Sequence, residues 1–413
     1  MGPFRYFEGQ LFCDEVPLEL IARTAGTPCY VYSANSILSA FGEYRSALAD
    51  LPHMVCYAVK ANSNLAIIRL LAGAGSGFDI VSGGELFRVL RAGGTANRIV
   101  FSGVGKTADE IEYALVNGIH SFNCESEAEL GLIDGIAARL ATKAKFSLRI
   151  NPDVSADTHP YISTGLTDHK FGIDLRTATK VYRAANRFAN LIPEGLSCHV
   201  GSQILDPSPI LEAAEKLLDF AVDLRAAGIG INHVDIGGGL GIAYRSGENS
   251  PSPSCLLNRL NRRLRETKLA IFVEPGRSIV GQAGALLTKV LYRKQNGEKD
   301  FAVVDAAMND LIRPALYESH HEILPLRASG EREVVDVVGP VCETGDFLAR
   351  NRPVAGAYPG DFLAIASAGA YGFAQSSNYN SRPRAAEVLV EGAQWRIVRA
   401  RETWEDLIRG EEI

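Results

Sequence analysis

Apolar residues in the first two thirds of the chain follow two alternating patterns, short β-branched runs and longer runs with helical spacing. Most of the short runs are apolar on both faces, as buried parallel strands are. They end near residues 59, 81, 101, 123, 150, 200, 236 and 273. Helical patterns separate them, over residues 65–72, 84–92, 107–117, 125–140, 174–189, 209–227 and 255–267. These repeats predict an α/β fold, a TIM (β/α)8 barrel over residues 34–280; a doubly wound sheet is the alternative, because strand number does not show closure.

The pattern changes after residue 280. Segments 285–292, 301–304, 333–338, 361–366 and 385–390 are short, β-rich and separated by turn residues. Residues 27–33 are also strand-like, although they precede the barrel pattern. We therefore predict a second, mostly β domain built from residues 1–33 and 281–413, which would bring the two ends of the chain together.

The composition is that of a globular protein with no preference for polyanions. The chain of 413 residues is 46% hydrophobic and 22% charged, and its length favours two domains over one core. The net charge of −6 and the absence of a long basic stretch argue against nucleic acid or an anionic membrane as a partner. No apolar run reaches the ~18 residues of a membrane span, and residues 1–15 show no signal pattern.

Cysteine usage indicates a reducing compartment. Seven cysteines, at positions 13, 29, 56, 124, 198, 255 and 342, form no CxxC pair and no zinc-binding spacing. An odd number scattered through a long chain predicts reduced thiols in a cytoplasmic protein. We expect no metal among the functional residues.

The most informative single residue is Lys60, which follows the apolar run 53–59. Asn62 or Asn64 would then cap the next helix. A lysine at the end of a buried strand is unfavourable unless it is paired, covalently bound or neutral. Schiff-base lysines are held in such places because desolvation favours the uncharged amine. The alternative is a lysine whose side chain extends from the strand end into solvent.

Other polar or glycine residues also follow the predicted strands, where a TIM barrel forms its active site. They are Asp79 after the second strand, His199 and Ser202 after the sixth, Gly237, Gly238 and Gly239 after the seventh, and Glu274, Gly276 and Arg277 after the eighth.

Each of these residues has both a functional and a structural interpretation. A glycine-rich turn such as 237–241 either binds phosphate through its backbone N–H groups or is a tight turn without a ligand. Glu274 is either a core acid paired with Arg277 or the partner of a ring nitrogen that must stay protonated. His199 is either a core histidine or a flat ring stacked on a flat cofactor. Taken with Lys60, the set fits pyridoxal phosphate.

Longer motifs resemble the fold-type III pyridoxal-phosphate decarboxylases, which are built like alanine racemase from a barrel and a β domain. The matching segments are 57–62, 199–202, 237–241 and 274–277. Further segments resemble the diaminopimelate decarboxylases of that family, namely 151–153, 159–165, 308–317, 339–346, 369–372 and 377–384.

The resemblance implies a role for each matching residue. Lys60 would form the Schiff base with pyridoxal phosphate, and Cys342 would be the proton donor. The expected cofactor-binding residues are Lys60, Asp79, His199, Ser202, Gly237, Gly238, Gly239, Glu274, Gly276, Arg277 and Tyr371. The expected substrate-binding residues are Arg277, Arg313, Tyr317, Glu343 and Tyr371, and Ser163–Gly165 matches a loop associated with the distal stereocentre.

The implied function is decarboxylation of meso-2,6-diaminopimelate to L-lysine and CO₂, the last step of lysine biosynthesis. The resemblance also implies a homodimer in which Cys342 and Glu343 complete the active site of the partner subunit. A related decarboxylase of ornithine, arginine or carboxynorspermidine is one alternative, but the pairing of Arg313 with Glu343 argues against it. A non-enzymatic pyridoxal-phosphate carrier is another, but carriers of that kind are single barrels.

Overall fold

The computed structural model describes residues 2–154, 170–328, 330 and 332–413. The chain forms two compact units. The barrel unit comprises residues 40–242 and 249–276, and the β unit comprises residues 1–39, 243–248 and 277–413. The segment 243–248, which directly follows the glycine run, therefore belongs to the β unit.

Eight parallel strands close into a barrel. They are β5 (His53–Ala58), β6 (Gly77–Ile80), β7 (Ile99–Phe101), β8 (Ser121–Cys124), β9 (Ala144–Arg149), β10 (Leu191–Ser197), β11 (His233–Asp235) and β12 (Ala270–Val273). The last strand pairs with the first, with Val273 of β12 beside Val55 of β5. This pairing confirms the TIM barrel, and the doubly wound alternative is wrong.

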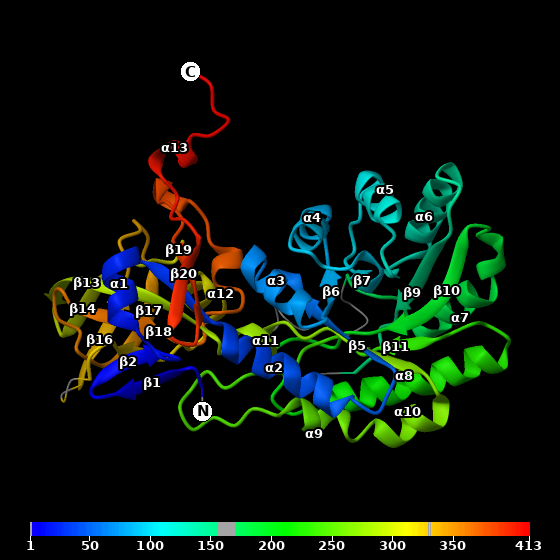
Figure 1. The fold of residues 1–413 in the computed structure, drawn as a ribbon, viewed down its shortest axis with the longest axis horizontal. Coiled ribbons are helices and arrows are strands. Elements are labelled where there is room, and N and C mark those ends of the chain that lie inside the picture. Colours follow the sequence, from blue (N-terminus) through cyan, green and yellow to red (C-terminus); the bar gives the residue numbers. More distant parts are fainter. Residues whose placement is uncertain (1, 155–169, 329, 331) are drawn as a thin grey trace. The chain divides into compact units, whose positions relative to one another are not determined.

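Helices cover the outside of the barrel strands, as Figure 1 shows. They are α3 (Leu65–Gly73), α4 (Gly83–Arg91), α5 (Ala108–Asn117), α6 (Glu127–Arg139), α7 (Leu175–Arg183), α8 (Ser208–Ala226), α9 (Pro253–Leu257) and α10 (Asn261–Thr267). Of the two asparagines expected to cap α3, Asn64 does so, because its side chain accepts a hydrogen bond from the Ala66 N–H. Thr107 and Glu110 form a capping box at the start of α5.

The prediction of a single helix over residues 255–267 is wrong, because two short helices, α9 and α10, occupy that stretch. Ser252 and Pro253 start α9, which ends at Leu257. The buried residues Leu257, Leu260 and Leu264 keep a helical spacing across the break. The hydrophobic pattern alone therefore does not reveal that the backbone is interrupted.

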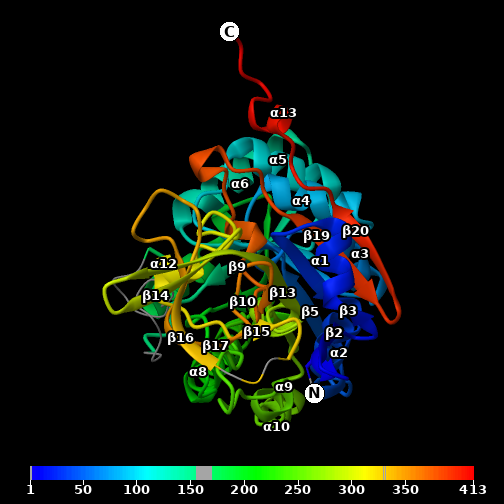
Figure 2. The same ribbon diagram turned by 90° about the vertical axis from the view of Figure 1, so that its left-hand side faces the viewer.

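The β unit contains two sheets. Its strands are β1 (Phe4–Phe7), β2 (Gln10–Cys13), β3 (Val16–Pro17), β4 (Cys29–Ser33), β13 (Gly284–Asn296), β14 (Lys299–Val304), β15 (Ile323–Pro325), β16 (Arg332–Val338), β17 (Phe347–Ala355), β18 (Phe362–Ile365), β19 (Ala386–Glu391) and β20 (Gln394–Arg399). The larger sheet has the order β17-β16-β14-β13-β4-β19-β20, and β18 also pairs with β13 and β15. Its paired strands β19 and β20 run side by side in Figure 2. The remaining helices are α1 (Leu18–Ala25), α2 (Ala34–Ala47), α11 (Arg277–Val280), α12 (Arg313–Tyr317) and α13 (Trp404–Leu407).

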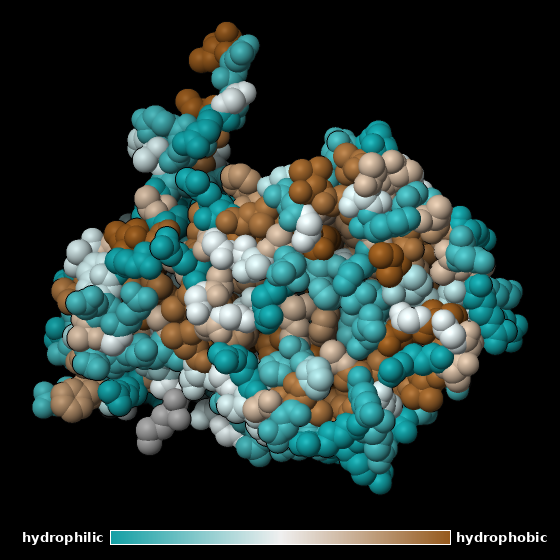
Figure 3. Space-filling view, turned by 45° about the vertical axis from the view of Figure 1, so that its right-hand side comes forward, coloured by the Kyte–Doolittle hydropathy of each residue, from teal (hydrophilic) through white to brown (hydrophobic). Residues whose placement is uncertain are grey.

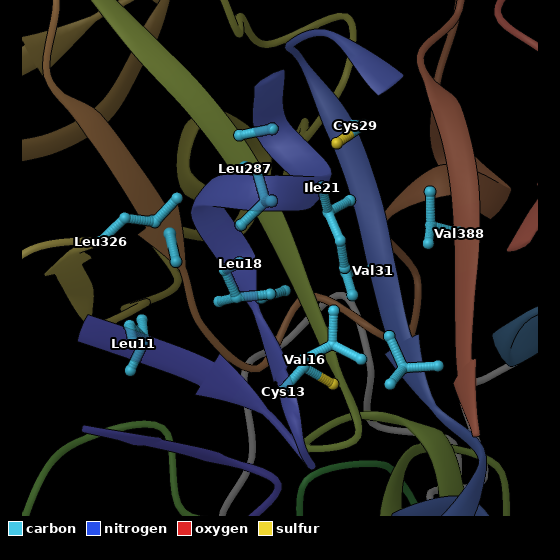
Figure 4. Close-up of a cluster of buried hydrophobic side chains, with 14 of the residues drawn as sticks. Leu11, Cys13, Val16, Leu18, Ile21, Cys29, Val31, Leu287, Leu326 and Val388 are labelled. Carbon is cyan, nitrogen blue, oxygen red and sulfur yellow. The ribbon is translucent and has the colours of Figure 1, made fainter. Parts of the chain in front are cut away.

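Strand β4 joins the two ends of the chain. It lies between β13 and β19, with Val31 beside Ala285 on one side and Val388 on the other. Side chains of α1, β2 and these three strands form one buried cluster, which Figure 4 shows around Ile21 and Val31. Each such side chain contributes roughly 1.5–3 kcal/mol by leaving water, so the N-terminal segment is an integral part of the β unit.

The face drawn in Figure 3 is mostly hydrophilic, with hydrophobic residues scattered in small groups. Among the described residues, no helix combines the length and the apolar character that a membrane crossing requires.

Candidate functional site

Lys60 lies in a short 3-10 turn, η1 (Val59–Ala61), directly after β5. The strand ends at Ala58, one residue earlier than expected, because the 3-10 turn begins at Val59. The Ala58 N–H donates to the C=O of Pro275, 3.1 Å away. Lys60 Nζ donates to Asp79 Oδ2 at 2.6 Å. The Asp79 side chain is completely buried, whereas that of Lys60 is 38% exposed. The lysine is thus both paired and accessible.

A second lysine, Lys106, shows what a purely structural lysine looks like in the same barrel. Its side chain is 1% exposed. Its Nζ donates to the C=O of Gly103 at 2.7 Å, the C=O of Asn123 at 2.8 Å and the carboxylate of Glu129 at 2.6 Å. These acceptors use all three donor positions of the ammonium group. Lys60, not Lys106, is therefore the lysine placed to react.

Three carboxyl groups meet inside the barrel, from Asp79 on β6, Asp235 on β11 and Glu274 after β12. Burial and the charges of Asp235 and Asp79 raise the pKa of Glu274 well above its usual range. Burial also raises the pKa of Asp235, to about 6, although a hydrogen bond from Glu274 opposes that shift. At neutral pH, Glu274 therefore holds a proton and Asp235 accepts it in a hydrogen bond.

The Asn123 side chain organises this group of acids. Its Nδ2 donates to Ser102 Oγ at 3.1 Å and to Glu274 Oε1 at 3.2 Å, and lies 3.5 Å from Asp235 Oδ2. The Ser102 hydroxyl lies 3.4 Å from the same Glu274 oxygen. Our sequence reasoning missed Asn123 and Ser102. Their positions at the ends of β8 and β7 are the signal that could have identified them.

The glycine turn after β11 contacts His199. The Gly238 N–H donates to His199 Nδ1 at 3.3 Å, which places the ring proton on Nε2. Burial lowers the pKa of His199 well below its usual range, so the ring is neutral at pH 7. The Gly237 N–H donates to Asp235 Oδ1 at 2.9 Å, and the backbone φ is +69° at Gly237 and +99° at Gly239. A Cβ at Gly237 or Gly239 would also lie 2.5 Å from a neighbouring carbonyl oxygen, so close packing requires glycine here. Binding of phosphate by the turn stays a prediction.

Two further expected residues follow β10 and β12. Ser202 lies beyond β10 and is partly exposed. Gly276 is buried, and a Cβ there would lie 2.9 Å from that of Ala61, the neighbour of Lys60. The glycine therefore allows the loop after β12 to approach the turn that carries Lys60.

In the β unit, Arg277 and Arg313 lie among three tyrosines. Arg277 donates from Nη1 to the Tyr244 hydroxyl at 2.6 Å, and its guanidinium lies 4.9 Å from the centroid of the Tyr371 ring. The Arg313 guanidinium lies 5.5 Å from the ring centroids of Tyr244 and Tyr317. The structure thus brings together four of the expected residues and adds Tyr244, which we did not predict.

This cluster has the properties of an anion-binding site. Arg277 and Arg313 are only 5% and 6% exposed. Burial lowers the pKa of Arg313, and the charge of Arg277 lowers it further. Arg313 Nε is buried and has no hydrogen-bond partner within the described part of the chain. A carboxylate would satisfy the unused N–H and offset the two like charges.

His321 supports the cluster from behind. Its ring meets that of Tyr244 edge to face, with centroids 5.2 Å apart. Its Nδ1 lies 2.9 Å from the C=O of Ala366, and burial lowers its pKa to about 3. No motif in the sequence pointed to His321 or Tyr244, because the fold brings them together from positions 77 residues apart (321 − 244).

Cys342 and Glu343 lie on an exposed loop between β16 and β17. The Cys342 N–H donates to Asn380 Oδ1 at 2.8 Å. The Tyr379 hydroxyl donates to Glu343 Oε2, also at 2.8 Å. The two expected residues therefore share one small surface cluster. The expected Ser163–Gly165 segment lies outside the described residues.

Comparisons with known proteins agree with the chemistry that this geometry indicates. Residues 34–281 match the model of the family "Pyridoxal-dependent decarboxylase, pyridoxal binding domain". This match defines the class that the barrel and its accessible lysine indicate, a decarboxylase that depends on pyridoxal phosphate.

Full-length relatives narrow the class. The chain is 52% identical to diaminopimelate decarboxylase of Pseudomonas aeruginosa, over 100% of this chain and 99% of that protein. It is 52% identical to the Vibrio cholerae enzyme of the same name, over 97% of each. The crystal structure of Helicobacter pylori diaminopimelate decarboxylase complexed with L-lysine has 45% sequence identity and a TM-score of 0.91, over 95% of this chain and 98% of that one. The chain belongs to the diaminopimelate decarboxylase family.

Pyridoxal phosphate fits the residues of the barrel unit. Lys60 offers an accessible primary amine, and His199 offers a neutral flat ring. Among the crowded acids Asp79, Asp235 and Glu274, Lys60 supplies positive charge to Asp79, and a protonated ring nitrogen would supply it beside Glu274. Asp79 Oδ1 is buried and has no hydrogen-bond partner among the described residues, so an acceptor also remains available.

Proposed function

We propose that this chain removes the carboxylate at one end of meso-2,6-diaminopimelate and releases L-lysine and CO₂, the last step of lysine biosynthesis. The observation that carries the proposal is the buried Arg313, which feels the like charge of Arg277 and whose Nε has no hydrogen-bond partner among the described residues. A substrate with an amino-acid group at each end supplies one carboxylate to react and another to be bound. Ornithine and arginine have no second carboxylate.

The barrel residues hold the reacting end. When bound, pyridoxal phosphate supplies an aldehyde for the amine and a ring that accepts the electron pair left by CO₂. Lys60 would bind the cofactor covalently through Nζ, and Asp79 orients that amine before the cofactor binds. His199 would pack flat against the ring. The glycines 237–239 and Gly276, with Ser202, would lie around the phosphate.

Glu274 controls the charge of the ring. Because its pKa is raised well above the usual range, it holds a proton before the cofactor binds. That proton would be shared with the ring nitrogen, which leaves a carboxylate facing a positively charged ring. Asn123 and Ser102 keep the Glu274 carboxyl in place by hydrogen bonds to Oε1. By keeping the ring protonated, Glu274 would favour loss of CO₂.

The β unit would recognise the distal end of the substrate. Arg277 and Arg313 would bind the distal carboxylate, with Tyr317 and Tyr371 packed against the two guanidinium groups. Glu343 would receive the distal ammonium. A site built from such charges rejects substrates that lack them, because its buried groups would remain unpaired.

We also propose that Cys342 and Glu343 act in the active site of a partner subunit, which makes the enzyme a homodimer. Both side chains are exposed in the single chain. A proton donor that competes with bulk water is ineffective, so a covering partner would give Cys342 the enclosed setting that its role requires. Cys342 would hold at Sγ the proton that replaces the departing carboxylate. The seven free thiols support a cytoplasmic location.

The substrate is tested by CO₂ release from the cofactor-loaded enzyme with meso-diaminopimelate, L-lysine, L-ornithine and L-arginine as separate substrates. We expect turnover of meso-diaminopimelate alone. Arg313→Lys should raise the KM for it by at least about tenfold, because an ammonium cannot replace bidentate binding. Equal or faster turnover of ornithine or arginine by the unmodified enzyme would contradict the proposal.

Shared active sites are tested by mixing two inactive variants, Lys60→Ala and Cys342→Ala, under conditions that exchange subunits. Half of the dimers then contain one chain of each kind, and each of these has one intact site of two. Activity should recover to about a quarter of the unmodified level. If both residues serve the same chain, the mixture stays inactive.

A further inference from the structure

The opposite end of the barrel contains a second group of reactive side chains. His120 directly precedes β8, Glu194 lies on β10 and His233 begins β11. One ligand atom of each residue lies within 4.8 Å of those of the other two. His120 and His233 are at the amino-terminal ends of β8 and β11, and Glu194 lies in the middle of β10, directly before the residue that pairs with His233. The candidate active site instead follows the carboxyl-terminal ends of the strands. No function described above uses them.

Both histidines present a nitrogen that nothing else in the described chain uses. His233 is 2% exposed, and its Nδ1 is buried without a hydrogen-bond partner. Its other nitrogen, Nε2, lies 3.2 Å from Ser147 Oγ. His120 Nε2 is likewise buried without a partner, while the ring hydrogen-bonds to the backbone of Asn97. In both rings one nitrogen is held by an oxygen and the other is available, as in histidines that bind metal ions.

Two local features of β10, a β-bulge and a glycine, shape the group formed by His120, Glu194 and His233. The pairing of β10 with β9 shifts register between Pro193 and Gly195, so Glu194 is the extra residue of a β-bulge. Bulges redirect a side chain, and they are common beside functional sites. At Gly195, a Cβ would lie 2.4 Å from the His233 ring, so only glycine leaves room for that ring.

From these contacts we propose that His120, Glu194 and His233 form a binding site for a divalent transition-metal ion, with zinc as the best match to two imidazoles and one carboxylate. The unused nitrogens are His120 Nε2 and His233 Nδ1, and Glu194 supplies an oxygen. Water would complete a tetrahedral set. The ion would join three barrel strands at their amino-terminal ends. No motif in the sequence indicates this site, because its two histidines are 113 positions apart (233 − 120).

Two features determine how the ion would bind. Zinc bonds of about 2.1 Å place tetrahedral ligand atoms about 3.4 Å apart, so the side chains must close inward from their present separation. Lys145 Nζ lies 3.3 Å from Glu194 Oε1, and the lysine is exposed. The ammonium competes with the metal for this carboxylate and must swing outward. The remaining walls are Phe272, stacked on His233 at 4.0 Å, and Ser147.

The test uses cofactor-loaded enzyme freed of metal with a chelator, and ZnCl₂ as the probe. Isothermal titration should show about one tight zinc per chain, and zinc should raise the unfolding temperature. His120→Gln and Glu194→Gln should weaken binding by at least about 100-fold, more than loss of a supporting partner costs. Lys145→Gln should bind at least about threefold more tightly, because the competing charge is gone.

His53→Gln is the matched control. His53 begins β5 at the same end of the barrel, is half-buried and hydrogen-bonds through Nδ1 to Leu51, but is not in the group. Its zinc affinity should equal that of the unmodified enzyme. The proposal would be overturned if the unmodified chain did not bind zinc. It would also be overturned if His120→Gln and Glu194→Gln bound zinc as tightly as the unmodified enzyme. Decarboxylase activity is not the readout, so failure here leaves the proposed reaction unaffected.

Discussion

Lys60 Nζ lies 2.6 Å from Oδ2 of a fully buried Asp79, and yet 38% of the lysine side chain is accessible. The aspartate offsets the charge of the amine without enclosing it. Of the two interpretations that the sequence left open for Lys60, this pairing favours the Schiff-base lysine over a side chain that simply extends into water. The Schiff base itself stays a prediction.

Replacing Lys60 by alanine should abolish the visible absorption band of the lysine–cofactor Schiff base. Activity should fall by at least about 1,000-fold, as for other covalent catalysts. Absorption spectra with added pyridoxal phosphate and CO₂ release measure the two effects. Lys216→Ala is the control, because the Lys216 side chain is 39% exposed and pairs with Glu212. A Lys60→Ala variant with an unchanged spectrum would exclude the role.

Glu274→Gln should make the cofactor-free protein more stable and the loaded enzyme less active. The amide removes one of three crowded carboxyls, so the unfolding temperature should rise by about 2 °C or more. The gain should grow with pH, because a carboxyl whose pKa is raised by folding loses stability as the pH rises through that pKa. Turnover should fall at least about 100-fold, since an amide cannot exchange a proton with the ring.

Glu298→Gln is the control, because Glu298 is exposed. It should change neither the unfolding temperature of the cofactor-free protein nor the turnover of the loaded enzyme. A lower unfolding temperature for cofactor-free Glu274→Gln would show that the three acids are not in conflict.

Tyr244→Phe should weaken recognition of the distal carboxylate. The variant loses the hydroxyl that accepts a hydrogen bond from Arg277 at 2.6 Å but keeps the ring beside Arg313. A hydrogen bond to a charged group contributes about 1.5 kcal/mol, so the KM for meso-diaminopimelate should rise about tenfold while kcat changes little. Tyr292→Phe, at a tyrosine 68% exposed, is the control. A fall in kcat at constant KM would place Tyr244 elsewhere in the mechanism.

Cys342→Ala should retain the absorption spectrum of the bound cofactor and lose at least about 100-fold in turnover, because the proton donor is gone. The chain offers a natural control, since Cys255 and Cys342 are its two exposed cysteines. Cys255→Ala should behave like the unmodified enzyme. Full activity of Cys342→Ala would remove Cys342 as the proton donor.

His321 should make the enzyme less stable in mild acid. Burial lowers its pKa to about 3, so the folded state keeps the ring neutral while the unfolded state takes up a proton below about pH 6.5. Stability from this group is therefore present above pH 6.5 and is lost as the pH falls, by about 2 kcal/mol at pH 5. Thermal unfolding at pH 7 and pH 5 measures the loss. In His321→Gln the unfolding temperature should fall less between pH 7 and pH 5 than in the unmodified enzyme. An equal fall would show that His321 is not the group responsible.

Much of the barrel could be predicted because its signals are local. The strands are continuous apolar runs, and the helices between them begin at polar caps such as Thr107 and Asn64. The glycine turn and Lys60 were recognisable for the same reason, since each lies next to a strand that the hydrophobic pattern marks. The break between α9 and α10 was not recognisable, because buried leucines keep their spacing across it.

The sequence by itself determined the order of strands and helices and the family motifs, and it singled out Lys60 as the lysine expected to react, because these depend on neighbours in the chain. Only the tertiary structure decided that β12 pairs with β5 and closes the barrel. It also decided that Asn123 reaches Glu274, that Tyr244 meets Arg277, and that His120 and His233 lie together. Hydrogen bonds and electrostatic interactions act over a few ångströms of space, and separation along the chain carries no information about them once the chain has folded.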